Sequence, residues 1–342
     1  MIELASLNAV GSGLVRPECV IAHASGLVFT ADWHGEGGVA IIGTDGRVSR
    51  ITARGAPRTM RPNGIALEPG GSFLLADLGA EEGGVFRLQP DGGIEPVATV
   101  IDGRPFPATN FVYRDADGGL WVTVSTRRVP RDLGYRPDVD DGFIVRIDRR
   151  GARIVADRLG YTNECHVSPD GGHLYVNETF TRRLSRYALR ADGSLADKEV
   201  VATFGPGTFP DGLAFDAEGG IWITSIVSNR LIRVTPDGRQ EMMLEDADAG
   251  HLDAVEQAYA AGRLGRPHLD TVRSTLLRNI SSLAFGGPDL TTAWLGCLLG
   301  DSLLSFRSPV AGAPPVHWSH PLGPLASHAA AGPFPANGAS AE

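Results

Sequence analysis

Short apolar segments recur along the whole chain, each entered through a polar residue and followed by a glycine-containing turn. Two of them read NECHVSPDGGHLYVNE from Asn163 and DGLAFDAEGGIWITS from Asp211. In each, an apolar stretch of strand length precedes the turn and a second apolar stretch follows it, which predicts an antiparallel hairpin of two buried strands. Aligned on their turns, six such units begin at Glu18, Asn63, Asn110, Asn163, Asp211 and Ser281.

The spacing of the six units predicts how they are arranged. Successive units begin 45, 47, 53, 48 and 70 residues apart. After most hairpins a third apolar segment and a turn into a fourth follow, as in GGVFRLQPDGGIEPV from Gly83 and NRLIRVTPDGRQEMM from Asn229. Four strands per repeat at this period are typical of a β-propeller. We therefore expect an all-β, six-bladed β-propeller with four-stranded antiparallel blades, because an all-β sandwich would not explain six matches in register.

Two insertions interrupt the repeat. Residues 126–142 leave the second strand of the third unit, and residues 246–279 enter the sixth unit and account for the longest step. The second insertion has apolar residues at helical spacing, which predicts two helices: Leu252, Val255 and Tyr259, then Leu269, Val272 and Leu276. Loops that enter first strands or leave second strands share one face of a propeller, so both insertions should form a lid over the channel. The helical pair could equally form the surface of a homo-oligomer.

The propeller is expected to be one domain over residues 1–320. Residues 321–342 are rich in Ala, Gly and Pro and have no strand pattern, so we expect a disordered tail.

Composition and charge exclude several classes of partner. The net charge of −9 argues against nucleic acid and against anionic membrane surfaces, which both attract basic clusters. The three cysteines are too widely spaced for a disulfide framework or a zinc site: Cys19, Cys165 and Cys297. The N-terminus lacks a signal-peptide pattern, and no apolar run is long enough to cross a bilayer. We expect a cytoplasmic protein with a small-molecule substrate.

The residues that begin the units predict a polar well. The first strand of each blade lies nearest the axis, so the six side chains should meet at one end of the channel. Glu18, Asn163 and Asp211 offer hard oxygen ligands, and Asn63 and Asn110 offer two more. Such oxygens suit a divalent cation, which would also relieve the repulsion between two carboxylates. The spacing fits a wet polar channel without an ion equally well.

Several stretches resemble the senescence-marker-protein/gluconolactonase family, which includes regucalcin: RPE at 16–18, RPNGIAL at 61–67, TNECHVSPDGGHLYVNE at 162–178, PDGLAFDAEGGIWIT at 210–224 and SSLAFGGPDL at 281–290. The resemblance covers roughly residues 14–310 and implies a six-bladed propeller lactonase with one divalent metal in the well. It maps the metal triad onto Glu18, Asn163 and Asp211 and the substrate-contacting residue onto Asn110. Ca²⁺ is the expected ion, with Zn²⁺, Mn²⁺, Mg²⁺ or Fe²⁺ as alternatives.

Two positions depart from the family. Ala108 stands where sugar-lactonase members often have Arg, and Phe111 stands where they have Asp. The Arg would bind polyol hydroxyls, so its absence argues against a sugar lactone. Phe106 and Phe111 suggest a more apolar substrate, unless both pack between blades.

A hydrolytic mechanism follows from these residues as a hypothesis. A cation would polarise an ester carbonyl and activate water, and Asp211 would act as general base. Asn110 and Asn63 would orient the carbonyl or an adjacent hydroxyl. His34, beside Trp33, is a candidate for the rim of the well, unless it only occupies a turn. No G-x-S-x-G nucleophile motif occurs.

Other polar residues receive simpler interpretations. Strand alternation points Cys19, Cys165 and His166 away from the well, into the interior. The basic residues of the first insertion would either bind an acidic substrate group or form a solvated loop: Arg127, Arg128, Arg131 and Arg136. Two other functions stay open, namely a metal-dependent lyase or isomerase acting on an enolisable carbonyl, and a calcium-binding propeller without catalysis.

Overall fold

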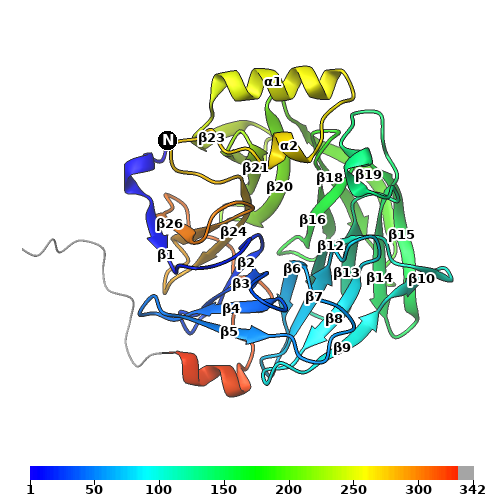
Figure 1. The fold of residues 1–342 in the computed structure, drawn as a ribbon, viewed down its shortest axis with the longest axis vertical. Coiled ribbons are helices and arrows are strands. Elements are labelled where there is room, and N and C mark those ends of the chain that lie inside the picture. Colours follow the sequence, from blue (N-terminus) through cyan, green and yellow to red (C-terminus); the bar gives the residue numbers. More distant parts are fainter. Residues whose placement is uncertain (330–342) are drawn as a thin grey trace, which may run out of the picture.

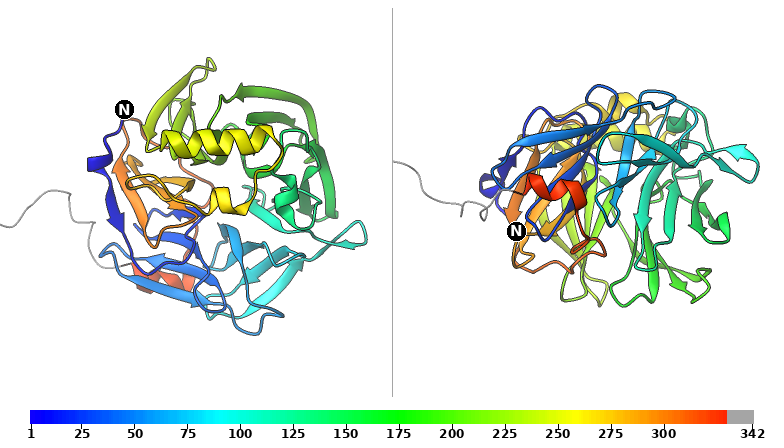
Figure 2. Two further views of the ribbon diagram at one scale, coloured as in Figure 1. Left: turned by 45° about the horizontal axis from the view of Figure 1, so that its top comes forward. Right: turned by 90° about the horizontal axis from the view of Figure 1, so that it is seen from below.

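Six four-stranded antiparallel sheets stand around a central channel as the blades of a propeller (Figures 1 and 2). The structure is a computed structural model, and it describes residues 1–329. It confirms the predicted all-β, six-bladed architecture. In the described part of the chain, no helix is both long and apolar enough to cross a membrane.

The first three blades follow chain order from the inner to the outer strand. Blade 1 contains β2 (Val20–Ala22), β3 (Val28–Asp32), β4 (Gly38–Ile42) and β5 (Val48–Thr52). Blade 2 contains β6 (Pro62–Leu67), β7 (Phe73–Asp77), β8 (Gly84–Leu88) and β9 (Ile94–Ala98). Blade 3 contains β12 (Thr109–Arg114), β13 (Leu120–Val124), β14 (Gly142–Asp148) and β15 (Gly151–Leu159). The short ribbon of β10 (Val100–Ile101) and β11 (Arg104–Pro105) connects blades 2 and 3.

The last three blades include the closure of the ring. Blade 4 contains β16 (Thr162–Val167), β17 (His173–Glu178), β18 (Arg183–Leu189) and β19 (Leu195–Thr203), and blade 5 contains β20 (Thr208–Phe215), β21 (Ile221–Val227), β22 (Arg230–Val234) and β23 (Gln240–Glu245). Blade 6 contains β24 (Ile280–Gly286), β25 (Thr292–Cys297) and β26 (Leu303–Arg307), and its outer strand is β1 (Asn8–Val10), which follows a 3₁₀ turn at Leu4–Ser6. The two ends of the propeller sequence therefore meet in one sheet.

The first strands form the inner wall. Contacts run from β2 to β6, β12, β16, β20 and β24 and back to β2, which closes the ring. Aromatic residues fill the space between blades, and Trp121, Trp222, Phe73 and Phe209 are among the largest fully buried side chains.

A register shift marks the entrance of five first strands. The pairing of the first with the second strand shifts between Pro62 and Ile65, Thr109 and Phe111, Thr162 and Cys165, Pro210 and Leu213, and Ile280 and Ser282. Each irregular stretch contains the polar residue that begins its unit. A β-bulge re-aims side chains, so the simple alternation assumed from the sequence is interrupted at these positions.

Buried acids hold the hairpins of blades 3 and 5. The carboxylate of Asp115 accepts hydrogen bonds from Trp121 Nε1 at 3.0 Å and Arg146 Nη1 at 2.5 Å. Asp216 in blade 5 repeats this arrangement with Trp222 Nε1 at 2.8 Å and Arg233 Nε at 2.6 Å. These acids are therefore structural, because their charge is paired within the blade.

The second insertion contains helix α1 (Ala249–Ala260) and the short helix α2 (Arg266–Leu269), which lie across one end of the propeller (Figure 2). The second expected helix ends earlier than predicted, and Leu276 is exposed. The reason is the carboxylate of Asp246, which accepts hydrogen bonds from the backbone N–H groups of Thr275, Leu276 and Leu277 at 2.7–3.0 Å. These bonds hold the returning chain in a loop where the sequence pattern predicts helix.

The two insertions pack together through aromatic side chains. Tyr135, in the first insertion beside a 3₁₀ turn at Arg131–Gly134, lies 4.6 Å from Phe180, centroid to centroid. Phe209 lies 5.5 Å from Tyr259 of α1, and Arg182 stacks on both rings while pairing with Glu256. The shared cluster confirms that both insertions lie at the same end of the propeller.

The C-terminal segment crosses the opposite end of the channel. Ala313 N donates to Phe215 O at 2.9 Å, and Ala24 N donates to Trp318 O at 3.0 Å. A 3₁₀ turn at Gly323–His328 (red in Figure 1) follows. Its Leu325 is buried against the core that blades 1 and 2 share. The expected disorder is thus wrong for residues 321–329, because Leu322 and Leu325 find an apolar surface to cover. The rest of the expected tail, residues 330–342, lies outside the described residues.

Candidate functional site

The residues that begin the six units are all buried near the lid end of the channel. Glu18 precedes β2, and the others lie in the bulged entrances of β6, β12, β16, β20 and β24. Their exposed fractions are 6% for Glu18, 3% for Asn63, 3% for Asn110, 5% for Asn163, 3% for Asp211 and 1% for Ser281. The first strands of neighbouring blades contact one another around the channel, so the structure brings these six positions together.

Hydrogen bonds from this ring connect neighbouring blades. Ser281 Oγ donates to Glu18 O at 2.9 Å, and Asn63 Nδ2 donates to Asn110 O at 3.1 Å. Asn163 Nδ2 donates to Thr179 Oγ1 at 3.1 Å, and that hydroxyl donates to Pro210 O at 2.8 Å. The side-chain N–H groups are therefore used to hold the ring.

Three side-chain oxygen atoms of the same ring accept no hydrogen bond from the described residues. Asn63 Oδ1 and Asn110 Oδ1 are buried and accept no hydrogen bond from the described residues. Glu18 Oε2 accepts none either, although Arg16 Nη2 lies 2.8 Å from it as an ion pair. A buried acceptor without a donor is costly, so these atoms indicate a ligand with positive or donor character.

Asp211 is electrostatically strained. Burial, followed by the nearby charges of Glu18 and Glu164, raises the pKa of Asp211 well above its ordinary value. Arg16 and Arg131 act in the opposite direction but do not outweigh these effects. A cation among the carboxylates would remove the conflict.

The donor set fits a hard divalent cation. Among residues 1–329, no group of three or more His, Cys, Asp or Glu side chains could hold a metal ion. The predicted triad contains one amide and two carboxylates, so it is not a group of this kind. The same ring also contains the unpartnered amide oxygens of Asn63 and Asn110. Two carboxylates with neutral oxygen donors are the ligands that Ca²⁺, Mg²⁺ and Mn²⁺ favour. The triad of Glu18, Asn163 and Asp211 thus stays a prediction with a chemically suitable surrounding.

A cavity of about 320 Å³ lies at the mouth, bordered by residues that precede first strands or follow second strands. Its lining includes Ala108 and the guanidinium-bearing residues Arg16, Arg61, Arg131 and Arg266. Arg16 and Arg61 stand over the ring of Trp33, with Cζ 4.7 Å and 5.2 Å from its centroid. The position where family members often carry an arginine is therefore apolar here, but arginines reach the mouth from other elements. We name this space the mouth cavity.

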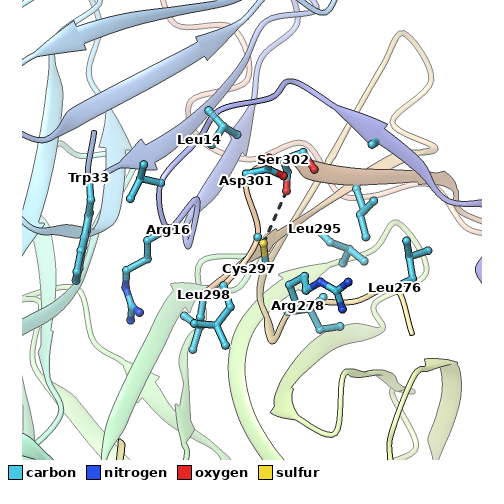
Figure 3. A pocket seen from close by; sticks show the side chains of 16 residues that line it. Leu14, Arg16, Trp33, Leu276, Arg278, Leu295, Cys297, Leu298, Asp301 and Ser302 are labelled. Atoms are coloured by element: carbon cyan, nitrogen blue, oxygen red, sulfur yellow. Dashed lines mark hydrogen bonds between the residues drawn. The ribbon is translucent and has the colours of Figure 1, made fainter. Parts of the chain in front are cut away.

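A second cavity of about 580 Å³ adjoins the other side of Arg16 and Trp33. Figure 3 shows Arg16 and Trp33 along one side of it and Leu276 and Arg278 along the other. Leucine side chains dominate the remaining lining: Leu14, Leu295, Leu298, Leu299 and Leu304. Arg16 and Trp33 thus border both the arginine-rich mouth cavity and a second cavity rich in leucine, which Arg278 and Asp301 also line.

The structure does not bring every predicted residue to the site. Phe111 and Phe106 belong to buried clusters between blades, and Phe111 contacts Gly64 and the ring of His166. This favours the packing role over a contact with substrate. His34 is exposed in its turn and is not part of the mouth lining, whereas its neighbour Trp33 is. The roles assigned to His34 and Phe111 receive no support from this geometry.

Interior roles are found for several side chains. Cys19 and Cys165 are free and buried in the core, as is Cys297 at the second cavity. Burial raises the pKa of the Cys297 thiol to about 11. His166 stacks on Tyr113, with centroids 5.0 Å apart, at the far end of the channel.

Sequence reasoning missed several residues of the ring. Glu164 is 5% exposed, and its Oε2 accepts from Leu213 N at 3.0 Å. Asn177 Nδ2 donates to Asp211 O at 2.9 Å and thereby holds the bulge. Both lie within TNECHVSPDGGHLYVNE, so a signal was present. The register shift between Thr162 and Cys165 interrupts the alternation at Glu164, so the pattern did not place this side chain.

The chain is thus a six-bladed propeller with three buried, unpartnered oxygens at one end of its channel, which make the well a candidate site for an ion or a small molecule. The family description "SMP-30/Gluconolactonase/LRE-like region" matches residues 18–245, and the chain belongs to this family.

Individual relatives agree with this assignment. The 6-deoxy-6-sulfogluconolactonase of Pseudomonas putida is 29% identical over 203 residues, which are 57% of this chain and 66% of that protein. A pentonolactonase of Haloferax volcanii is 25% identical over 243 residues, 70% of this chain and 67% of that protein. The chain thus spans slightly less than two thirds of the first of these relatives.

Solved structures show the same fold. The calcium-binding protein regucalcin from Agrobacterium tumefaciens has a TM-score of 0.61 at 17% identity, covering 92% of this chain and 96% of that one. At this identity the similarity concerns the fold alone.

Proposed function

We propose that this protein hydrolyses a lactone or related cyclic ester in the well, with a divalent cation held by Glu18, Asn163 and Asp211. The carrying observation is the ring of buried oxygens without partners, which stands in a family whose relatives include proteins named as lactonases. Ca²⁺ is the expected ion. When bound, such a cation polarises a carbonyl and makes bound water more acidic.

The chain's own residues would perform the remaining tasks. Asp211 would take a proton from the attacking water through the carboxylate oxygen that does not bind the cation. Water would add to the carbonyl carbon, the ring C–O bond would break, and the leaving oxygen would take up the proton to give a hydroxy acid. No covalent enzyme intermediate is needed.

The asparagines would orient the substrate. Asn63 Nδ2 already donates to Asn110 O, so Asn63 offers the acceptor Oδ1 to a hydroxyl of the substrate or to the attacking water. Asn110 offers its acceptor Oδ1 and a side-chain Nδ2 that donates to none of the described residues, so it could also hold the carbonyl. The lid would keep bulk water from the site, because Tyr259 and Tyr135 pack into one aromatic cluster with the propeller.

A lactone panel with and without a chelator tests the proposal. Hydrolysis that is lost with chelator and regained with Ca²⁺ is expected, and water labelled with ¹⁸O should place the label in the carboxylate of the product. Asp211→Asn should lower kcat roughly 100-fold or more, since it removes the base. The matched control is Asp289→Asn, an exposed carboxylate paired with Arg307, which should keep activity.

Two outcomes would favour the other functions. Consumption of a carbonyl substrate without incorporation of label would indicate a lyase or isomerase. Cation binding without turnover on any lactone would indicate a calcium-binding propeller. A cytoplasmic location and self-association through the lid stay predictions, to be checked by fractionation and by light scattering.

A further inference from the structure

The mouth cavity concentrates positive charge on a chain whose net charge is −9. Its arginines come from four distant parts of the sequence: Arg16 precedes blade 1, Arg61 precedes blade 2, Arg131 lies in the first insertion and Arg266 begins α2. Like charges gathered at one concave surface repel each other unless an anion joins them.

Two of the four guanidinium groups are unpaired. Arg16 pairs with Glu18 at 2.8 Å, and Arg266 pairs with Asp270. Among residues 1–329, Arg61 and Arg131 form no ion pair with a carboxylate. The hydrogen bond that the Arg61 guanidinium makes within the described residues is a long one, from Nη1 to the backbone carbonyl of its neighbour Met60 at 3.5 Å.

Other arginines of the same insertion behave differently. Arg127 pairs with Asp157 and Arg136 with Asp138, both at 2.8 Å. Arg127 and Arg136 therefore fit the interpretation of a solvated basic loop. Of the four arginines in this insertion, Arg131 lines the mouth cavity. The first insertion thus presents one free cationic group to the cavity.

Trp33 orients the guanidinium groups of Arg16 and Arg61. Trp33 Nε1 donates to Pro62 O at 2.8 Å, which holds the indole in place. Arg16 and Arg61 lie over this indole, so their planar groups lose little freedom when they bind an anion. Asp132 shares the lining, and its Oδ1 is buried without a partner, so it can accept a hydrogen bond from a substrate hydroxyl.

We propose that the substrate of this site is a lactone that carries an anionic group, a carboxylate or a sulfonate, and that Arg61 and Arg131 bind this group at the mouth. That the substrate is a lactone rests on the proposed function, whereas the anion site does not depend on it. A neutral substrate would leave both guanidinium groups without a hydrogen-bonded anion, which is unfavourable. Glu18 and Asp211 act on Arg131 only through their charge and form no ion pair with it. Ala108 leaves room for the anion beside them.

The first test compares two substrates of the same shape. These are γ-butyrolactone with a γ-carboxylate and the same lactone with a neutral γ-carboxamide. The native protein should prefer the carboxylate by about 10-fold or more in kcat/KM. Arg61→Gln and Arg131→Gln should each lower kcat/KM for the carboxylate roughly 10- to 100-fold, mainly through KM, and change the carboxamide less than about 3-fold. A γ-sulfomethyl analogue distinguishes sulfonate from carboxylate as the preferred group.

Control variants separate charge from folding. Arg136→Gln, in the same insertion but paired with Asp138, should affect neither substrate. Arg131→Lys should restore part of the preference, because it keeps the charge without the planar fork. Equal losses on both substrates would overturn the proposal, since the arginines would then serve the carboxylate formed on ring opening.

A binding measurement separates this proposal from the proposed function. Saturation-transfer NMR with propane-1-sulfonate and with propionate should show binding to the native protein and none to the Arg61→Gln/Arg131→Gln double variant. If no lactone is hydrolysed but this difference holds, the hydrolase proposal fails and the anion site stands. If the double variant binds both anions as the native protein does, the anion site is refuted.

Discussion

Replacing Asp211 by asparagine should stabilise the metal-free protein and abolish its stabilisation by a divalent cation. The side chain is 3% exposed, and burial, then Glu18 and Glu164, raises the pKa of its carboxylate. Asparagine has the same shape without the charge. Removing a buried carboxylate that is repelled by two others and attracted by two arginines should add about 1–3 kcal/mol to the free energy of unfolding. For a chain of this size, that corresponds to a rise in Tm of about 1–4 °C.

The cation should stabilise the native protein and have little effect on the variant. At a concentration of about 100 times its Kd, a ligand that binds only the folded state adds about 2.7 kcal/mol. Native protein should therefore gain about 4 °C in Tm on addition of Ca²⁺, while Asp211→Asn should gain little. Asp289→Asn, an exposed carboxylate, should change Tm by less than about 1 °C and keep the Ca²⁺ effect.

The pH dependence provides an internal check. Because the pKa of Asp211 is raised in the folded state, its stabilising contribution is complete below the ordinary value of 3.8 and is lost as pH rises through the folded-state pKa. The advantage of Asp211→Asn in metal-free protein should thus be absent below pH 3.8 and grow toward neutrality. Differential scanning calorimetry measures all three quantities. A variant that melts lower than the native protein without metal, or that keeps the Ca²⁺ effect, would refute the reasoning.

Three further outcomes are expected. Burial lowers the pKa of His317 to about 3, so the native state should lose stability as pH falls from about 6.5 toward 3. His317→Asn should reduce this loss by an amount on the order of 1–3 kcal/mol, measured in acid titrations followed by fluorescence. Equal acid sensitivity of both proteins would contradict this expectation. The thiols should resist Ellman's reagent in the folded protein and react after unfolding in urea, because burial raises the pKa of each: Cys19, Cys165 and Cys297; fast labelling without denaturant would contradict their burial. Arg182→Met removes the ion pair with Glu256 and the stacking on Phe209 and Tyr259. Amide hydrogen exchange in α1 should therefore accelerate at least about 5-fold, while exchange in blade 1 stays unchanged. Unchanged exchange in α1 would show that other contacts hold the lid.

The local parts of the fold were predictable because they depend on neighbours in the chain. The hairpins follow from apolar runs and glycine turns, and the six-fold repeat follows from their spacing. The pairing of β1 with β26 was not predicted, because it joins residues such as Asn8 and Ser305 from opposite ends of the chain. The early end of the second lid helix was missed for a similar reason, since Asp246 acts on Thr275 across the insertion.

The candidate site was partly predictable. The polar residues at the unit entrances were found from the repeat, and the structure buries all of them near the lid end of the channel. Their partners were missed where a bulge breaks alternation, as at Glu164, or where a second strand contributes, as at Asn177. The suggestion of an apolar substrate came from Phe106 and Phe111, and both prove to be buried in clusters between blades.

The sequence by itself determined the number of blades, the strands within them and the polar residues of the well, because each depends on a pattern that repeats along the chain. The tertiary structure decided the character of the mouth. Arg16, Arg61, Arg131 and Arg266 share no motif and no spacing, and only the closure of the ring and the folding of both insertions over it gather their charges around one cavity.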